Sequence, residues 1–402
     1  MLPSRRTLIL AQIPPPTHGQ SVMVGHLVGD IAARNSKDFV HVNLRLSKDS
    51  QDVGRMRPAK LILLAWCAVK ALVACTLRGA KTIYYVPAPG KRGAIIRDVL
   101  LLSLLKPFTR HLILHWHAVG LGDYLKSNPD DFWGKRLLRL LKGHRLSICL
   151  SQSTSVDIRY FQPLEIAIIP NGIPDPCPEF PRVLAARRAR LALRRFAMQE
   201  KAAPPAAIHL VYIGLCTRSK GIFEALCTAA ALTANLNDQH ACCPIILTIA
   251  GPFASEAEQL EFAAAIRQST DSLPCLIRPL FTVHQPGFTG PEEKRKLLEM
   301  ADLFIFPTRY ENEGLPLTLL ESLAFGLPVL TTRWRSIPDA LPSDYSWMAD
   351  SQNALNMTQL AKEALFSDAF PALREWFLLH FTLESHLSAI FHHLRLVSPH
   401  KQ

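Results

Sequence analysis

The 402-residue chain is 49% hydrophobic and contains 30 prolines and 19 glycines, a composition that excludes an intrinsically disordered protein. A single hydrophobic core rarely grows to this length, so we expect two domains of about 200 residues each. The net charge of +12 is uneven, because residues 1–200 carry 30 Lys and Arg against 13 Asp and Glu, while residues 201–402 carry 15 against 20.

The basic half narrows the choice of partners. Such a surplus suits nucleic acid, an anionic membrane surface or an anionic substrate. The aromatic residues are not interleaved with the basic ones, as a platform for stacking bases requires, so no nucleic acid is expected. We expect an anionic membrane surface or an anionic acceptor to meet the amino-terminal half.

Cysteines and apolar segments indicate the compartment. The nine cysteines form no CxxC pair and no metal-ligand spacing, which favours reduced thiols and a cytoplasmic location. At the amino terminus only seven mostly apolar residues separate Arg6 from three prolines, too few for a signal peptide. The apolar run Leu61–Leu77 contains Lys70 near its centre, which costs about 3 kcal/mol in a bilayer. We interpret it as a buried or interfacial helix of a protein attached peripherally to the inner membrane face.

Short apolar runs alternate with helical patterns along the whole chain, which is typical of parallel α/β sheets. Strands are expected in the first half at Thr7–Ile13, Phe39–Leu46, Thr82–Pro87, His111–His117, Leu146–Ser151 and Ile166–Pro170. A proline-rich passage and a basic helix, Val183–Met198, then indicate a domain boundary. Strands are expected in the second half at His209–Gly214, Ile245–Gly251, Leu276–Phe281, Asp302–Pro307 and Pro328–Thr332.

The predicted organisation is two Rossmann-like, doubly wound domains that face each other across a cleft. Residues 1–173 form the first domain and 207–380 the second. Residues 174–206 supply a linker with a basic helix, and 381–402 a carboxy-terminal helix that can cross back to the first domain.

Three loops of the first half follow predicted strands. QIPPPTHGQS places Gly19 before a helix, where the backbone can approach a phosphate. HLILHWHAVGLGDY ends a strand with His115 and His117, which share one side of it by two-residue periodicity. IIPNGIPD carries Asn171 and Gly172, which suit a turn and act mainly as a hinge.

The second half has a richer set of such loops. LVYIGLCTRSKGIFEAL places Gly214 at a strand end and Lys220 just before a helix, with Arg218 beside it. A lysine there can neutralise a departing diphosphate as a point charge. Two further segments predicted to contain strands, LTIAGPFASEAEQL and FTVHQPGFTG, include Gly251 and Val283. We expect the backbone of these two residues to lie beside a ligand.

The run EGLPLTLLESLAFGLPVL, Glu313–Leu330, holds the most information. It follows the buried strand word ADLFIFPT, and its apolar residues recur at helical spacing after Pro316. The first turn of that helix points N–H groups at the carboxyl end of the sheet, where ligands of α/β proteins bind. Glu313 and Glu321 flank the turn, eight positions apart.

Together these segments resemble retaining glycosyltransferases of family 4, which have the GT-B fold and the pattern E-x7-E. The resemblance implies transfer of a hexose-type sugar from a UDP-, GDP- or ADP-sugar in the second domain to an acceptor in the first. It also implies that no metal or other cofactor is needed. The acceptor expected is a saccharide, lipid-linked or part of a growing envelope or capsule polysaccharide.

The resemblance also implies roles for individual residues. Glu321 would accept both ribose hydroxyls, and Lys220, helped by Arg218, would stabilise the leaving diphosphate. Glu313 and His117 would lie beside the donor sugar. The remaining donor contacts would come from Gly19, Gly214, Gly251, Val283, Gly314, Leu315 and Leu317.

Two departures from the family pattern keep alternatives open. Leu215 stands where the family has an arginine, and Pro316 removes a backbone N–H that could meet a sugar hydroxyl. A sugar-nucleotide 2-epimerase-like enzyme shares the two-domain architecture but needs no basic acceptor domain. A degenerate protein that binds sugar nucleotides without turnover is the non-enzymatic alternative. A glycosidase using the two glutamates ranks below both, because neither lies in a barrel-like pattern.

Overall fold

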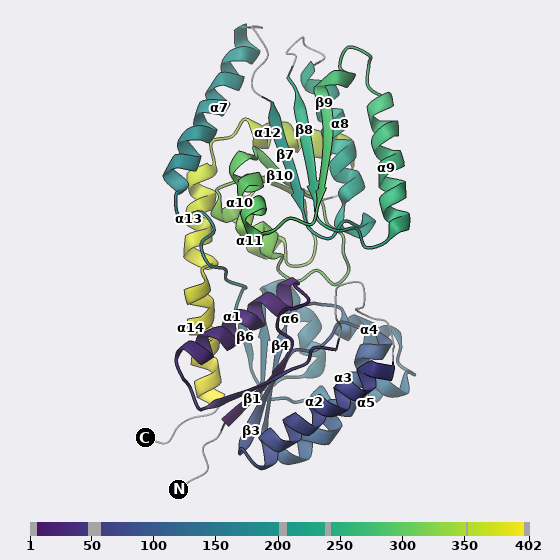
Figure 1. Cartoon of the computed structure of the whole chain (residues 1–402), viewed down its shortest axis with the longest axis vertical. Helices are drawn as coiled ribbons and strands as arrows, with labels where there is room; N and C mark the ends of the chain where they lie inside the picture. The colour runs from purple at the N-terminus through teal and green to yellow at the C-terminus, as the bar shows by residue number, and fades with distance from the viewer. Residues whose placement is uncertain (1–5, 47–57, 201–206, 238–242, 351–352, 398–402) are drawn as a thin grey trace. The chain divides into compact units, whose positions relative to one another are not determined.

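The computed structural model describes residues 6–46, 58–200, 207–237, 243–350 and 353–397 (Figure 1). Contacts divide the chain into two compact units. Unit 1 takes the described residues of Met1–Gly172, Glu311–Leu315 and Leu383–Gln402, and unit 2 takes those of Ile173–Tyr310 and Pro316–Thr382. The expected boundary at residue 173 lies beside this division, and residues 201–206 of the expected linker lie outside the described ranges.

Unit 1 is built on a six-stranded parallel sheet of order β2-β1-β3-β4-β5-β6. Its central strands are short apolar runs buried on both faces, as parallel sheets require. The strands are β1 (Arg6–Ala11), β2 (Phe39–Asn43), β3 (Ala80–Tyr85), β4 (His111–Trp116), β5 (Leu146–Cys149) and β6 (Ile166–Ile168). All six lie within strands that the sequence predicted or extend them by two residues at most.

Alternate residues of the unit 1 strands feed two separate cores. Leu8 and Leu10 of β1 pack with the helices α2 and α3, whereas Ile9 packs with α1 and α14. This alternation is the two-residue period of a strand. The helices are α1 (Gly19–Ala33), α2 (Pro58–Thr76), α3 (Arg92–Leu105), α4 (Leu121–Ser127), α5 (Phe132–Leu141), α6 (Gln152–Ile158) and α14 (Leu383–Val397), with the 3₁₀ turns η1 (Lys106–Phe108) and η2 (Arg159–Phe161).

Unit 2 contains a second six-stranded parallel sheet, of order β12-β11-β10-β7-β8-β9. Its strands are β7 (Ile208–Ile213), β8 (Ile245–Ala250), β9 (Phe281–Gly287), β10 (Leu303–Phe306), β11 (Val329–Thr332) and β12 (Met348–Ala349). Its helices are α7 (Phe180–Glu200), α8 (Ile222–Asn237), α9 (Glu256–Asp271), α10 (Pro291–Met300), α11 (Leu317–Ala324), α12 (Ala354–Leu365) and α13 (Phe370–His380). The two sheets confirm the predicted fold class of two Rossmann-like domains.

One predicted strand is wrong. Leu276–Phe281 is not extended, because the 3₁₀ turn η4 (Arg278–Leu280) fills half of it around Pro279. The strand begins at Phe281 instead and runs through FTVHQPG, whose residues are mostly exposed. It lies at the edge of the sheet, where polar residues and a proline are tolerated.

The basic helix α7 belongs to unit 2. The net charge of each unit therefore differs from that of each half of the sequence. Arg187, buried in this helix, donates to the carbonyl oxygens of Leu298 and Phe325, and Arg190 and Arg194 pair with the buried Asp302. Counted by unit, unit 1 carries 26 Lys and Arg against 13 Asp and Glu, and unit 2 carries 19 against 20. Unit 1 therefore carries a surplus of 13 basic residues. The arginines of α7 make contacts within unit 2.

The cysteines and the apolar helices bear on the expected compartment of the protein. The eight described cysteines are free thiols, six of them buried. Among the helices of the described ranges, none combines the length and the hydropathy needed to cross a bilayer.

Candidate functional site

The strand order of unit 2 reverses between β7 and β10. In open α/β sheets ligands bind at such a switch point, outside the carboxyl ends of the strands. The loops after β7 and β10 therefore frame the candidate site, and they carry Gly214–Lys220 and Pro307–Tyr310.

Two predicted glycines occupy the adjoining ends of β7 and β8. A Cβ on Gly251 would lie 1.8 Å from the carbonyl oxygen of Gly214, and its φ of +142° is one that other residues rarely adopt. Gly214 and Gly251 also continue the ladder, since their N–H groups donate to Ala250 and Gly287. Only glycine at position 251 lets the ends of β7 and β8 approach this closely.

Lys220 lies at the switch point. It ends the 3₁₀ turn η3 (Arg218–Lys220), and a Cβ on the next residue, Gly221, would meet the carbonyl oxygen of Pro307 at 2.3 Å. The loops after β7 and β10 therefore touch here. The Lys220 ammonium lies 4.8 Å from the centre of the Tyr310 ring and 5.6 Å from that of Phe306. Both rings attract a cation, so the charge is held at the carboxyl end of the sheet.

Arg218 has different partners from Lys220. Its guanidinium pairs with Glu261 of α9 and lies 4.0 Å from the centre of the Phe223 ring. Leu215, at the position of the family arginine, is 43% exposed. The structure thus directs one of the two predicted cations to the loop after β10 and the other to α9.

Glu321 lies in the middle of α11. Lys294 of α10 donates to its Oε1 at 2.5 Å, whereas Oε2 is buried without a hydrogen-bond partner in the described part of the chain. Burial raises the pKa of Glu321, and the charge of Lys294 opposes that shift. One carboxylate oxygen is therefore held by protein, and the other keeps unused capacity to accept a hydrogen bond. Sequence reasoning missed Lys294, whose only signal was a basic residue in the preceding helix.

The residues before α11 pack in unit 1. Asn171 donates to the carbonyl oxygen of Leu315 at 2.9 Å, and Asn312 donates to that of Val119 at 2.8 Å. A Cβ on Gly314 would lie 2.1 Å from the carbonyl oxygen of His117. Glu313, predicted to share the donor site with Glu321, is buried beside these residues. The contact division thus places the two glutamates of the motif in different units.

Histidines gather at the carboxyl end of the unit 1 sheet. The rings of His115 and His117 are 4.0 Å apart between centres, and His386 of α14 stacks on His115 at 6.2 Å. His115 is hydrogen-bonded to the Tyr84 hydroxyl, and His386 Nδ1 to the carbonyl oxygen of Pro170. Among the described residues, neither nitrogen of His117 has a hydrogen-bond partner. His386 was missed because nothing in its local sequence links it to β4.

Burial keeps these imidazoles neutral. It lowers the pKa of His117 to about 3 and that of His386 to about 4, and it holds the pKa of His115 well below its usual range. The neighbouring histidines act in the same direction. The carboxyl end of this sheet therefore offers neutral donors and acceptors instead of charge.

The remaining predicted contacts are placed as follows. Gly19 is the first residue of α1, next to His18, whose side chain accepts from the Ser21 N–H at the helix start. Leu317 is the first residue of α11, and Pro316 is its N-cap. Val283 lies in β9 opposite Leu247. Within the described ranges, no group of three or more His, Cys, Asp or Glu is arranged to hold a metal ion.

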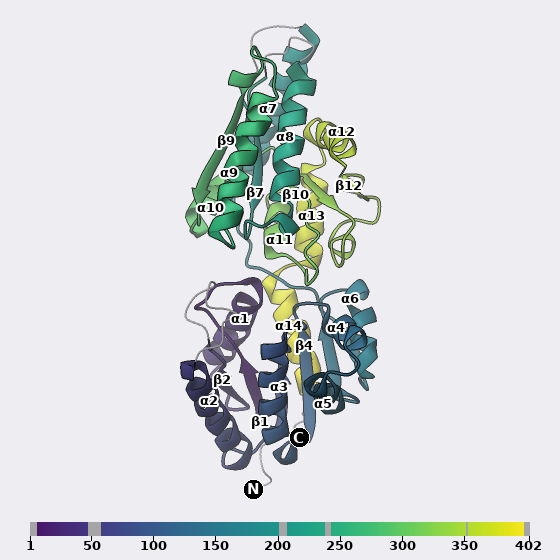
Figure 2. The ribbon, with the colours of Figure 1, turned by 90° about the vertical axis from the view of Figure 1, so that its right-hand side faces the viewer.

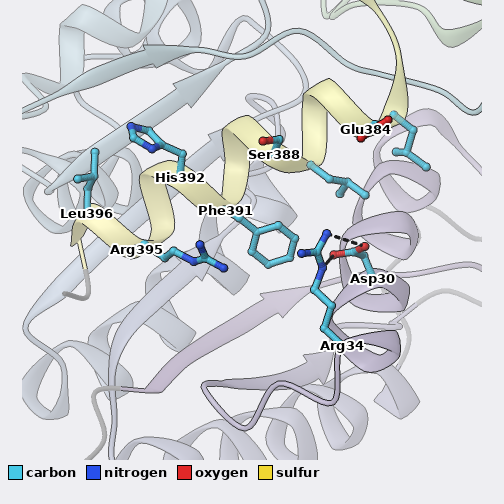
Figure 3. Close-up of a pocket in the computed structure, with 10 residues that line it drawn as sticks. Asp30, Arg34, Glu384, Ser388, Phe391, His392, Arg395 and Leu396 are labelled. Atoms are coloured by element: carbon cyan, nitrogen blue, oxygen red, sulfur yellow. Dashed lines mark hydrogen bonds and ion pairs between the residues drawn. The ribbon is translucent and has the colours of Figure 1, made fainter. Parts of the chain in front are cut away.

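A pocket of about 960 Å³ in unit 1 is separate from all these residues. Figure 3 shows it between α1 and α14, where Arg34 pairs with Asp30 and lies over the Phe391 ring. Its walls combine both signs of charge with apolar side chains. None of the predicted site residues lines it.

Comparison with known proteins adds a family match. Residues 194–365 match the model of the family described as Glycosyl transferases group 1. The matched segment contains all the predicted site residues except Gly19 and His117. It covers most of unit 2 and less than half of the chain.

Curated relatives agree at low identity. The chain is 23% identical over 181 residues to WcaL of Escherichia coli (strain K12), which is named as a colanic acid biosynthesis glycosyltransferase. That match covers 44% of this chain and 40% of WcaL, so the chain matches less than half the length of this relative. A shorter stretch of 73 residues is 34% identical to the amylovoran biosynthesis glycosyltransferase AmsK of Erwinia amylovora, covering 17% of this chain and 18% of AmsK.

Solved structures resemble the whole chain. Anabaena HepE in complex with UDP and glucose has a TM-score of 0.61 at 12% identity, with 97% of this chain and 100% of HepE covered. The α,α-trehalose 6-phosphate synthase of Burkholderia multivorans has a TM-score of 0.66 at 11% identity, covering 98% and 99%. At these identities the likeness concerns the fold, and it confirms the predicted GT-B class.

Proposed function

We propose that the chain is a retaining glycosyltransferase that resembles family 4 and uses a nucleotide-diphosphate sugar as donor. The observation that carries the proposal is the placement of Lys220 and Glu321 on the two chain segments that follow β7 and β10. These are the strands that flank the switch point, where a nucleotide sugar would bind. The family match over residues 194–365 supports the assignment.

In this proposal each residue has a defined task. Glu321 accepts the ribose hydroxyls with the carboxylate that Lys294 holds in place, a charge-assisted contact that fixes the nucleotide. Lys220 meets the diphosphate and stabilises the negative charge that grows as it leaves. The backbones of Gly214 and Gly251 lie close together without side chains between them. Their backbone groups can therefore come close to the ligand. Glu313, His117 and the N–H groups of Gly314 and Leu315 remain predicted contacts of the donor sugar.

The proposed acceptor is a lipid-linked or growing polysaccharide. Two relatives are named for the biosynthesis of colanic acid and amylovoran, and the surplus of basic residues lies in unit 1. Such acceptors are held at a membrane, so the proposal includes peripheral attachment to an anionic membrane surface.

The test is a calorimetric comparison of UDP-, GDP- and ADP-sugars with the full chain and with Glu321→Ala. We expect one nucleotide to bind selectively and the variant to bind it more weakly by about 1 to 3 kcal/mol, the value of a lost charge-assisted hydrogen bond. Glu321→Gln, which keeps the shape of the side chain, should show a similar loss.

Glu363→Ala is the matched control. Glu363 lies on α12 of the same unit and is exposed, with Gln359 as its hydrogen-bond partner. Its replacement should leave donor affinity unchanged. An unaltered affinity in Glu321→Ala would remove the ribose assignment. Selective binding without transfer to any saccharide acceptor would favour the non-catalytic alternative.

A further inference from the structure

The outward face of α2 is apolar. A helix on a protein surface normally turns charged and polar residues to the solvent. In α2 the exposed positions include Ile62, Trp66 and Val69, with 73%, 58% and 51% of their surface accessible. Their spacing of four and three residues places them on one stripe of the helix. The buried stripe is formed by different residues, Cys67, Ala71, Ala74 and Cys75, which pack on the sheet.

Neighbouring elements extend this apolar surface. Figures 1 and 2 show α2 and α3 side by side, and α2 also contacts the turn η1. Leu100 and Leu104 of α3 and Phe108 of η1 are 47%, 39% and 40% exposed. We call these six residues, Ile62, Trp66, Val69, Leu100, Leu104 and Phe108, the α2–α3 face.

Within residues 58–110, the segment that forms the α2–α3 face, the exposed charges have one sign. Between residues 58 and 110 Asp98 is the single acidic residue, and it is buried with bonds from Tyr85 and Arg97. The basic residues of the same segment reach the solvent at Lys70, Arg78, Lys91, Arg92, Lys106 and Arg110. Lys70 lies 5.0 Å from the centre of the Trp66 ring, so charge and apolar surface adjoin. By contrast, exposed Leu260 of α9 has Glu256, Glu258 and Glu261 as chain neighbours.

The positive charge beside the α2–α3 face favours some binding partners over others. In a twofold contact between copies of the chain, the same face meets itself, and basic residues would oppose basic residues. An anionic bilayer satisfies both parts of the surface, because apolar and aromatic side chains enter the interface while Lys and Arg meet the headgroups. Within the described ranges no helix can cross a membrane, which fits a helix that lies in the plane of the surface.

We propose that the α2–α3 face binds the surface of an anionic membrane, with α2 lying along it. The inference rests on the peripheral attachment proposed above and assigns it to one face of unit 1. It does not need a bound nucleotide, so the two proposals can fail separately.

The experiment is co-sedimentation of the full chain with vesicles. One set contains phosphatidylcholine alone, and the other contains about a third phosphatidylglycerol, which supplies the negative surface potential. We expect binding to the anionic vesicles that weakens as salt is raised. Ile62→Ser combined with Trp66→Ser should lower partitioning by on the order of tenfold, because two apolar side chains no longer leave water. Lys70→Glu should lower it by about fivefold or more, the effect of one well-placed charge.

A matched control replaces apolar residues elsewhere that are more exposed than Ile62 and Trp66. Leu276 and Leu355 of unit 2 are 91% and 82% exposed, and Leu276→Ser with Leu355→Ser should leave vesicle binding unchanged. The α2–α3 variant must also keep the nucleotide affinity and the thermal unfolding midpoint of the parent chain. A loss of vesicle binding with both retained would support the proposed face.

Three results would overturn the proposal. One is equal binding of the parent and the Ile62/Trp66 variant to anionic vesicles, and another is equal binding of the parent to neutral and anionic vesicles. A third is a dimer, seen by light scattering without lipid, that the same variant dissolves, because the face would then bind a second copy. Vesicle binding that persists in Glu321→Ala, whatever its nucleotide affinity, keeps this test independent of the donor site.

Discussion

The carboxyl ends of the two sheets differ in charge, and the difference is opposite to that of the units around them. Unit 1 carries the basic surplus, yet the end of its sheet is lined by neutral histidines. Unit 2 has 19 basic against 20 acidic residues, yet it places Lys220 and the Lys294–Glu321 pair beside its switch point. The net charge of a domain therefore does not predict the charge of its site.

The reason lies in where each unit places its basic residues. In unit 1 many of them are on the outer surfaces of α2, α3, α5 and the turns between them. In unit 2 the arginines of α7 are paired with Asp302, Asp368 and backbone carbonyls. Lys220 instead has two aromatic rings beside its ammonium group. Charge at a ligand site thus reflects a few positioned residues, and the surplus reflects the rest of the surface.

The largest effect is expected from Lys220→Ala, which removes the cation from the unit 2 site. We expect turnover to fall by roughly 100-fold or more, the usual cost of losing one electrostatic contact to a transition state. Affinity for the donor should fall less, because the negative charge on the diphosphate grows during the reaction. Donor hydrolysis and calorimetry measure the two quantities.

Lys296→Ala on α10 serves as the control for Lys220, because Lys296 is exposed and lies in the same unit. Its replacement should change neither turnover nor affinity. Equal losses of turnover and donor affinity in Lys220→Ala would contradict a role specific to the transition state.

Most of the fold could be predicted from the sequence because buried parallel strands are short apolar runs. Strands such as β7 and β8 begin and end within one residue of the prediction. β9 could not be found this way, since its exposed, polar residues at a sheet edge resemble a loop. The segment just before it, which contains η4, was taken for the strand.

The candidate site could be predicted only where it is local in sequence. Gly214 and Lys220 follow one strand and were identified together, and the glycine at 251 is required by its close approach to Gly214. Lys294 and His386 could not be assigned, because each meets its partner from a separate helix. The motif also predicts one site for Glu313 and Glu321. The contact division assigns the two residues to different units, and the shared site stays a prediction.

A second prediction concerns the neutral histidines of unit 1. Burial lowers the pKa of His386 to about 4 from its usual 6.5, so the native state binds fewer protons than the unfolded state between these pH values. Stability therefore falls as pH falls through this window, by about 2 kcal/mol per such group at pH 5. The charged form of His26 lowers the pKa of His386 further, whereas His115 and His117 beside it stay neutral in this window. His386→Gln removes the group, so its stability should fall about 2 kcal/mol less between pH 7 and pH 5.

Hydrogen exchange of peptides from β4 and β8 is the measurement, because a two-domain chain need not unfold in one step. The smaller pH effect in His386→Gln should appear in β4 and not in β8. His284→Gln replaces an exposed histidine of β9 in unit 2 and should leave both peptides unchanged. A pH effect on β4 that is the same in the parent and in His386→Gln would rule out this account.

The smallest effect is expected from Arg218→Ala, which tests whether unit 2 uses one cation or two. Arg218 and Glu261 are both 55% exposed, and such surface pairs contribute about 0.2 to 1 kcal/mol to stability. The guanidinium also lies over Phe223, so both of its contacts hold it to the outer helices α8 and α9. We therefore expect turnover to fall by less than tenfold, well below the loss in Lys220→Ala.

Glu261→Ala frees Arg218 from its ion pair. A rise in turnover in this variant that Arg218→Ala abolishes would show that Arg218 can reach the diphosphate. A loss in Arg218→Ala as large as that in Lys220→Ala would mean that the arginine leaves Glu261 during the reaction and that the site of unit 2 carries two cations.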